Sequence, residues 1–399
     1  MPDEKTDALV VGAGPVGLLL ANLLGAAGVN AALIDKRGEL PSQSRAIGVT
    51  PPSLHILEQL GLAETLIEAG VRVQEAVVFE GKRQSGAVSF RNLPGPYPFI
   101  LSVPQSETMR ILERNLGRFP HVERCQHMEF LETVTAADAA KVRIRDTLSG
   151  VTKTMLARLV LGCDGHRSTV RERSGLACSH KRYRVSFAMA DFDDSSDFGD
   201  EARLFFTPQG AVESFPLPGR RRRWIAQVPR ADNDYAIEDL VGLVHERTGF
   251  DLGVSDASKP SWFQPERLCC ESFGGASFLL CGDAAHVMSP IGGQGMNTGF
   301  ADAADAARIV KEYLDGKDWT SLWRGYDVRR RWAFKAAADR AAVGMWIGTR
   351  TGATGRLRSL FLRNGLLRGP LSKKLPPHFA MLTIPYVNWP FRTRVGRSR

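Results

Sequence analysis

Two features that would place this chain in a membrane or outside the cell are missing from its sequence. No stretch reaches the ~18 uninterrupted apolar residues that a membrane-spanning helix requires. Residues 1–7 are polar and acidic, so we expect no secretory signal peptide and predict a cytoplasmic protein. The shares of apolar residues (43%) and charged residues (24%) are those of an ordinary folded domain, which argues against a disordered chain.

Cysteine is scarce, with six residues in 399. None stands in a C-x-x-C pair or at a spacing from histidine that would indicate a zinc site. We therefore expect no metal site and no disulfide framework. We interpret the cysteines as small buried thiols in a reducing compartment.

Acidic residues are absent from residues 351–399, which carry ten basic residues. The rest of the chain is nearly balanced, with 42 basic and 43 acidic residues, so the net charge of +9 belongs to this segment. No basic stripe or recognition motif accompanies it, and we expect no nucleic-acid partner. We favour a solvated terminal segment over membrane contact, because stable anchoring needs more than a basic patch.

The first motif that is present is Gly12-x-Gly14-x-x-Gly17, between a predicted strand at 7–11 and an apolar helix at 18–27. Its glycines permit a tight turn and the close approach of a pyrophosphate, whose charge the helix N-terminus stabilises. Asp35 follows a second predicted strand, where it can accept hydrogen bonds from a ribose and repel a 2′-phosphate. We predict bound FAD or NAD rather than NADP. The residues predicted to contact it are Gly12, Gly14, Pro15, Val16, Gly17, Asp35 and Lys36.

A second motif favours FAD. Residues 278–299 read FLLCGDAAHVMSPIGGQGMNTG, which predicts a buried strand, a glycine-rich loop and a helix beginning near Asn297. Asp283 at the strand end can accept hydrogen bonds from ribityl hydroxyls. The N–H groups at the helix start can face the anionic pyrimidine edge of a reduced flavin. NAD has no ribityl chain for Asp283 to hold.

These motifs resemble those of the class A single-component FAD-dependent aromatic hydroxylases, related to p-hydroxybenzoate hydroxylase, over nearly the whole chain to about residue 345. The resemblance implies that the GDAAH segment and the following PIGGQGMN loop contact the flavin. It also implies a ribityl contact for Gln105 in VPQSETMR, a flavin and nicotinamide contact for Asp164 in CDGHRS, and an entrance position for Arg45 in SRAIGV. The implied cofactor contacts are Arg45, Gln105, Asp164, Asp283, Pro290, Gly293, Gly295, Met296 and Asn297.

Catalysis in such a protein is expected to centre on the flavin, with Pro290, Arg45 and His286 as the candidate protein groups. A structural role is favoured for His286 over that of a base, because its place in the motif is one of packing and hydrogen bonding. Capping of the turn after the strand is the alternative for Asp164. The run at 220–223, RRRR, follows Pro-Gly and predicts a solvated hairpin tip rather than a phosphate site.

The predicted fold class is α/β, a glutathione-reductase-like Rossmann-type FAD-binding domain with an inserted, mainly antiparallel substrate sheet and a C-terminal helical segment. We expect the FAD-binding domain at 1–175 and 265–345, with a hairpin at 73–90 leaning to the substrate side. The substrate domain is expected at 176–264 and the basic helical segment at 346–399. Candidates for the pocket wall are Phe187, Phe205, Phe206, Phe215 and Trp224, although ordinary core is the more common role of such aromatics.

The resemblance implies a monooxygenase that hydroxylates an aromatic or polycyclic, quinone-like small molecule through a C4a-hydroperoxyflavin. NADPH, or else NADH, would be the transient reductant and O2 the co-substrate. An epoxidase or a lipid-quinone hydroxylase at a membrane surface, and a reductase-type flavoenzyme without oxygen chemistry, remain alternatives. From another class, the chain could be a non-catalytic FAD- or ligand-binding protein. A halogenase is disfavoured, because WIAQVP at 224–229 departs from the W-x-W-x-I-P signature.

Overall fold

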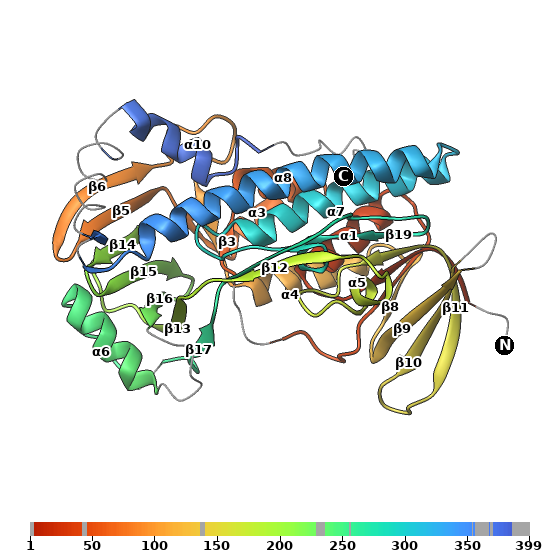
Figure 1. Cartoon of the computed structure of the whole chain (residues 1–399), viewed down its shortest axis with the longest axis horizontal. Coiled ribbons are helices and arrows are strands. Elements are labelled where there is room, and N and C mark those ends of the chain that lie inside the picture. The colour runs from red at the N-terminus through yellow and green to blue at the C-terminus, as the bar shows by residue number, and fades with distance from the viewer. Residues whose placement is uncertain are drawn as a thin grey trace, which may run out of the picture.

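The computed structural model describes residues 4–41, 46–135, 140–228, 236–254, 257–352, 354–355, 367 and 370–384. Figure 1 shows two large sheets at opposite ends of the molecule, bridged by two long helices, α7 (Gln294–Leu314) and α8 (Trp319–Gly348). Among the described helices, none has both the length and the apolar character of a transmembrane span. The predicted α/β fold with a second, mainly antiparallel sheet is confirmed.

The first sheet brings the carboxyl ends of parallel strands to one edge. Its order is β8-β2-β1-β11-β10-β9, with β19 beside the end of β11. The strands are β1 (Glu4–Val11), β2 (Ala31–Ile34), β8 (Val122–Cys125), β9 (Met128–Thr135), β10 (Ala140–Asp146), β11 (Thr152–Gly162) and β19 (Phe278–Leu280). β1 is parallel to β2 and β11, and β11 is parallel to β19, so both predicted glycine segments leave this edge. Ligands of open α/β sheets bind at such carboxyl edges.

Helices cover this sheet and fix its carboxyl edge. Beside α7 and α8 they are α1 (Pro15–Ala26), α2 (Pro51–Glu58), α3 (Ala63–Glu68), α4 (Gln105–Leu116) and α5 (Thr169–Arg173). Helix α1 packs between α4 and α7, which explains its almost wholly apolar sequence. The sequence did not predict α8, because much of its buried stripe is alanine, at 333, 337, 338 and 341, and gives only a weak apolar pattern.

The second sheet has the order β17-β13-β16-β15-β14-β5-β6. Its strands are β5 (Glu75–Glu80), β6 (Arg83–Ser89), β13 (Ser186–Asp193), β14 (Ala202–Thr207), β15 (Gly210–Leu217), β16 (Arg221–Val228) and β17 (Ser261–Phe263). In this sheet only β14 and β5 pair in parallel. The hairpin β5–β6 joins a sheet whose other strands begin 97 residues after β6 ends. One face packs on α6 (Ile237–Thr248) around the buried Trp224. The other face is available for a ligand.

Two three-stranded sheets complete the described fold. One has the order β3-β7-β4, with β3 (Gly48–Val49), β4 (Val71–Val73) and β7 (Ile100–Ser102). The other has the order β12-β18-β20, with β12 (Cys178–Arg182), β18 (Glu266–Cys270) and β20 (His286–Val287). Near the C-terminus, a 3-10 helix, η3 (Pro370–Lys374), leads into α10 (Leu375–Phe379), which packs near β6. Most of the predicted basic segment at 346–399 lies outside the described residues.

The prediction that the cysteines are all free thiols is wrong, because Cys178 and Cys270 form a disulfide. The two residues are directly opposite each other on the antiparallel strands β12 and β18. They are 92 residues apart in sequence, so no local spacing could reveal their pairing. The interpretation of these two cysteines as thiols of a reducing compartment is therefore wrong.

Candidate functional site

The first glycine motif forms the turn from β1 into α1. Gly12 adopts a φ of +102°, and a Cβ there would stand 2.6 Å from the carbonyl oxygen of Cys163, so only glycine fits. A Cβ at Gly14, by contrast, would meet no atom within 4 Å. The first turn of α1 carries no acidic residue. The turn therefore leaves open space in front of unpaired N–H groups, which is suited to a phosphate.

Asp35 closes this turn from the end of β2. Its Oδ2 accepts a hydrogen bond from the Ala13 N–H at 2.7 Å, and the Arg37 guanidinium binds both carboxylate oxygens at 2.9 Å. Burial would raise the pKa of Asp35, but the hydrogen bonds from Arg37 and Ala13 outweigh burial and lower it. Arg37 also offsets the charge that was expected to repel a 2′-phosphate, so the argument against a bound NADP loses its force.

The second glycine segment packs directly on the first. It runs from β19 through the 3-10 turn η1 (Gly282–Ala284) and β20 to the start of α7. A Cβ at Gly282 would stand 3.0 Å from Val16, and a Cβ at Gly299 on α7 would stand 2.6 Å from Val16. The Val16 side chain thus fits between two glycines of the other motif. Segments more than 260 residues apart in sequence meet at one place.

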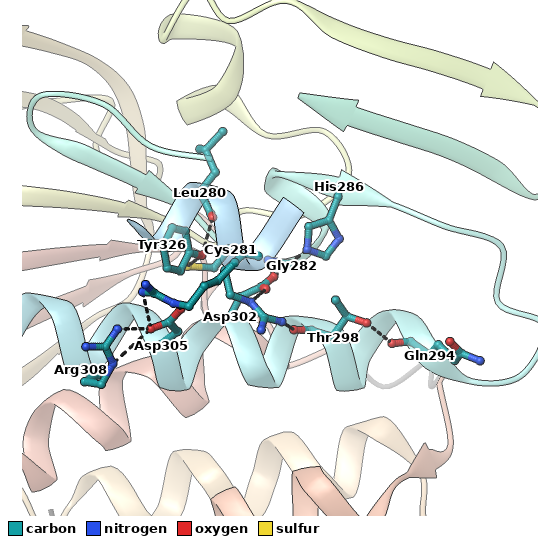
Figure 2. Close-up of polar contacts among 12 residues, drawn as sticks. Leu280, Cys281, Gly282, His286, Gln294, Thr298, Asp302, Asp305, Arg308 and Tyr326 are labelled. Carbon is teal, nitrogen blue, oxygen red and sulfur yellow. Dashed lines mark hydrogen bonds and ion pairs between the residues drawn. The ribbon is translucent and has the colours of Figure 1, made fainter. Parts of the chain in front are cut away.

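Asp302 on α7 holds the second segment in position (Figure 2). Its buried carboxylate accepts hydrogen bonds from the Gly282 N–H at 2.9 Å, from His286 Nε2 at 2.7 Å and from Arg330 Nε at 2.6 Å. Burial would raise the pKa of Asp302, but the charges and hydrogen bonds of His286 and Arg330 lower it to about 2. His286 is itself buried and stacks on Phe334, away from the cavity described below. This arrangement supports a structural role for His286.

Three other predicted contacts have side chains committed to protein partners. The Asp164 carboxylate accepts hydrogen bonds from Ser168 Oγ and from the first N–H groups of α5, so it does cap the turn. Asn297 bonds Thr50 through Oδ1 and the Gly293 carbonyl through Nδ2. The Oε1 atom of Gln105 accepts from the Ala46 N–H. These hydrogen bonds hold the segments beside the glycine loops in position.

One cavity of about 1100 Å³ connects these elements. Its wall includes thirteen of the predicted cofactor contacts: Gly12, Gly14, Pro15, Val16, Asp35, Lys36, Gln105, Asp164, Asp283, Pro290, Gly293, Gly295 and Met296. Gly17 and Asn297 do not line it, and Arg45 lies outside the described residues. Cys163 and Cys281 also line it, and hydrogen bonding between their side chains, together with burial, raises the pKa of Cys163.

The second sheet forms the far wall of the same cavity. Side chains alternate along its strands, so Phe187, Phe206 and Phe215 line the cavity, whereas Phe205 and Trp224 pack in the core under α6. Met189, Leu204, Glu213, Arg223 and Ile225 also line it and were not predicted. The alternation was visible in the sequence, but which face would meet a ligand was not.

The prediction of a solvated arginine run is wrong for two of its members. Arg222 and Arg223 lie inside β16 and are 0% and 3% exposed. Arg222 pairs with Asp194 at 3.0 Å, and Arg223 pairs with Asp191 at 2.6 Å. Only Arg220 is at the turn. Buried guanidinium groups require such carboxylate partners, which β13 and the residue after it supply here.

At the rim of the cavity, three basic side chains contact the Glu266 carboxylate. One carboxylate oxygen lies 2.8 Å from His166 Nε2 and 3.0 Å from His180 Nε2, and the other accepts from Arg182 Nε at 2.7 Å. Burial would raise the pKa of Glu266, but these hydrogen bonds lower it. The carboxylate is satisfied by protein donors, so we interpret the cluster as a link between β12, β18 and the loop at 164–168.

Two curated proteins are similar in sequence to most of this chain. The chain is 27% identical over 375 residues to a 3-(3-hydroxy-phenyl)propionate/3-hydroxycinnamic acid hydroxylase of Mycobacterium sp. (strain JLS), covering 92% of this chain and 64% of that protein. It is 32% identical over 342 residues to 6-methylpretetramide 4-monooxygenase of Streptomyces rimosus, covering 83% and 60%. The chain thus spans less than two thirds of these curated relatives.

A solved structure matches over a longer share of both chains. The p-nitrophenol 4-monooxygenase of Pseudomonas putida DLL-E4 superposes with a TM-score of 0.87, at 22% identity, over 96% of this chain and 100% of that one. At this identity the match shows the fold. A family model described as "FAD binding domain" matches residues 5–341. The chain therefore belongs to this FAD-binding family, and the resemblance to FAD-dependent aromatic hydroxylases that its motifs indicated is confirmed.

Proposed function

We propose that this chain binds FAD and uses NADPH or NADH together with O2 to hydroxylate an aromatic or polycyclic small molecule. The observation that carries the proposal is the single cavity that joins two glycine loops to the apolar face of a second sheet. The named activities of the relatives, hydroxylation of phenylpropionate and pretetramide compounds, support the reaction class. Neither nucleic acid nor a membrane is a proposed partner.

The residues of the cavity fit FAD at both ends. The open space at Gly14 and the N–H groups of α1 would hold the pyrophosphate, and Asp35 borders the place of the adenosine ribose. At the other end, α7 begins with no acidic residue in its first turn, and a Cβ at Gly293 would meet no atom within 4 Å. The N–H groups there would face the pyrimidine edge, and the exposed Asp283 would face the ribityl chain.

Bound FAD would pass the electrons of NADPH or NADH to O2 and so activate it, and the protein would supply binding and orientation. The apolar side chains of the second sheet would hold an aromatic ring and exclude water. Pro290, exposed in the loop before α7, lines the cavity and would border the reacting edge of that ring. We propose residues 1–175 and 265–345 as the FAD-binding part and residues 176–264, with the hairpin at 73–90, as the substrate part.

The test is turnover by the purified protein loaded with FAD. NADPH and NADH oxidation would be followed against phenols, quinolones and polycyclic aromatics, with product mass measured under isotopically labelled O2. We expect one substrate class to accelerate nicotinamide oxidation and to gain one labelled oxygen atom. Peroxide without hydroxylated product would overturn the proposal. Turnover without O2 would identify a reductase, an epoxide product would identify an epoxidase, and FAD that neither nicotinamide reduces would indicate a non-catalytic binding protein.

A further inference from the structure

Glu213 is the acidic side chain in the substrate wall of the cavity. It lies on β15 between Val212 and Ser214, which are buried on the opposite face of the sheet, and its own side chain lines the cavity. On the neighbouring strands its direct partners are Leu204 and Ile225. Directly paired side chains lie on the same face, so a carboxyl group stands in an apolar row.

The charge of Glu213 has no compensating partner within the described residues. Of the cavity-lining side chains on β5, β6 and β13–β17, two are charged, Glu213 and Arg223. The Arg223 guanidinium is bound by both carboxylate oxygens of Asp191, at 2.6 and 2.8 Å. Met189 on β13 and Val78 on β5 extend the apolar row to either side. The other titratable groups of the cavity, among them His166, Glu266 and Asp283, belong to the nucleotide-binding elements and the rim.

A half-buried carboxyl in this position of the cavity wall discriminates between ligands by charge. Burial raises the pKa of Glu213 to about 7, so both protonation states are available near neutral pH. A ligand hydroxyl or amino group can donate a hydrogen bond to the carboxyl and replace the water it loses. A ligand carboxylate near ionised Glu213 would place two like charges in an apolar wall, which is strongly unfavourable.

We infer that Glu213 is a specificity-determining residue that selects aromatic substrates bearing a hydroxyl or amino group over aromatic substrates bearing a carboxylate. The inference rests on the proposed function and names the substrate class of the same cavity. It separates this chain from an enzyme that holds an acidic substrate by a free arginine, because Arg223, the cationic group of this wall, is already paired with Asp191.

The experiment compares two probes of one shape, 2-naphthol and 2-naphthoate, on the protein loaded with FAD. Dissociation constants are measured at pH 6, 7 and 8 from the change in flavin absorbance, which requires no turnover. At pH 8 we expect 2-naphthol to bind at least about tenfold more tightly. If 2-naphthoate requires protonated Glu213, its dissociation constant rises roughly tenfold from pH 6 to pH 8, while that of 2-naphthol changes by less than about twofold.

Glu213→Gln removes the charge and keeps the shape. In this variant we expect the dissociation constant of 2-naphthoate to become independent of pH. The preference for 2-naphthol over 2-naphthoate falls below about threefold. Glu201→Gln is the matched control, because Glu201 pairs with Arg203 at 2.8 Å and does not line the cavity, and it behaves as wild type.

Equal binding of both probes by the wild type at pH 8, binding of neither, or an unchanged preference in Glu213→Gln overturns the inference. The pH series of the wild type decides the matter even if the variant does not fold. Failure of the proposed function is seen separately, as lack of FAD retention or of hydroxylated product.

Discussion

Replacing Glu213 with glutamine is expected to stabilise the protein at pH 8 and to change its stability little at pH 4.5. The reason is the environment of the carboxyl, which lies among apolar side chains with no cation paired to it in the described part of the chain. Its pKa is raised from 4.5 to about 7 in the folded state. Between these values the unfolded chain ionises Glu213 while the folded chain keeps it protonated.

The sign and size of the effect follow from this difference. Where the folded state binds more protons than the unfolded state, stability falls as pH rises. A wild-type protein therefore loses up to about 3 kcal/mol between pH 4.5 and pH 8 through this group alone, at about 1.4 kcal/mol per pKa unit. Glutamine has no such loss, so the variant is expected to be more stable by up to about 3 kcal/mol at pH 8 and by less than about 0.5 kcal/mol at pH 4.5.

Urea unfolding of both proteins, loaded with FAD, at pH 4.5, 6, 7 and 8 measures this difference, because groups common to both cancel. Glu201→Gln serves as control and is expected to change stability by less than about 1 kcal/mol at every pH, because its ion pair with Arg203 is partly exposed to solvent. A difference that stays constant with pH, or a less stable Glu213→Gln at pH 8, would refute the position of an unpaired carboxyl in the apolar wall of the cavity.

Three further substitutions test other parts of the structure. Asp302→Asn removes a buried ion pair and is expected to lower the free energy of unfolding, measured in urea at pH 7, by about 3–5 kcal/mol. Because the pKa of Asp302 is lowered to about 2, the wild type but not the variant loses this stabilisation as pH falls from 3.8 towards 2. Cys178→Ser opens the disulfide to Cys270 and is expected to cost roughly 2–4 kcal/mol, an effect that a reducing agent reproduces on the wild type and that is absent if the cysteines are free. Arg222→Ala, which leaves a carboxylate unpaired, is expected to cost about 3–5 kcal/mol, whereas Arg221→Ala at a more exposed pair costs less than about 1 kcal/mol; equal costs would contradict the burial of Arg222.

Local sequence patterns predicted the elements whose turns and helices depend on residues close together in the sequence. The glycine turn after β1, the apolar helix α1 and the strand before Asp35 follow within 35 residues, so their spacing alone indicates a nucleotide site. The second motif was located equally well, although α7 begins at Gln294, three residues before the predicted start. Even the structural interpretation of His286 could be made from its place in the motif.

What the sequence could not predict depends on pairing between distant strands. The register of β12 on β18 creates the disulfide, and the register of β16 on β13 brings Asp191 to Arg223. A run of four arginines appears solvated until those carboxylates are known. The position of Glu213 is of the same kind, since alternation divides a strand into two faces but does not show which face borders a cavity.

The central claim is that the two glycine loops hold the two ends of one FAD molecule. Binding of FAD and of ADP to the flavin-free protein, measured by calorimetry, tests it directly with one variant in each loop. Gly14→Val fills the open space at the pyrophosphate, in a backbone conformation that valine can adopt. Gly293→Asn fills the space at the start of α7, where the φ of +64° is one that asparagine tolerates. Gly199→Asn, at an exposed turn with a φ of +58°, is the control.

We predict that Gly14→Val weakens both FAD and ADP by about tenfold or more, and that Gly293→Asn weakens FAD to a similar extent while leaving ADP within about twofold of wild type. Binding of FAD that Gly293→Asn leaves unchanged, or a protein that binds no FAD, would contradict the account.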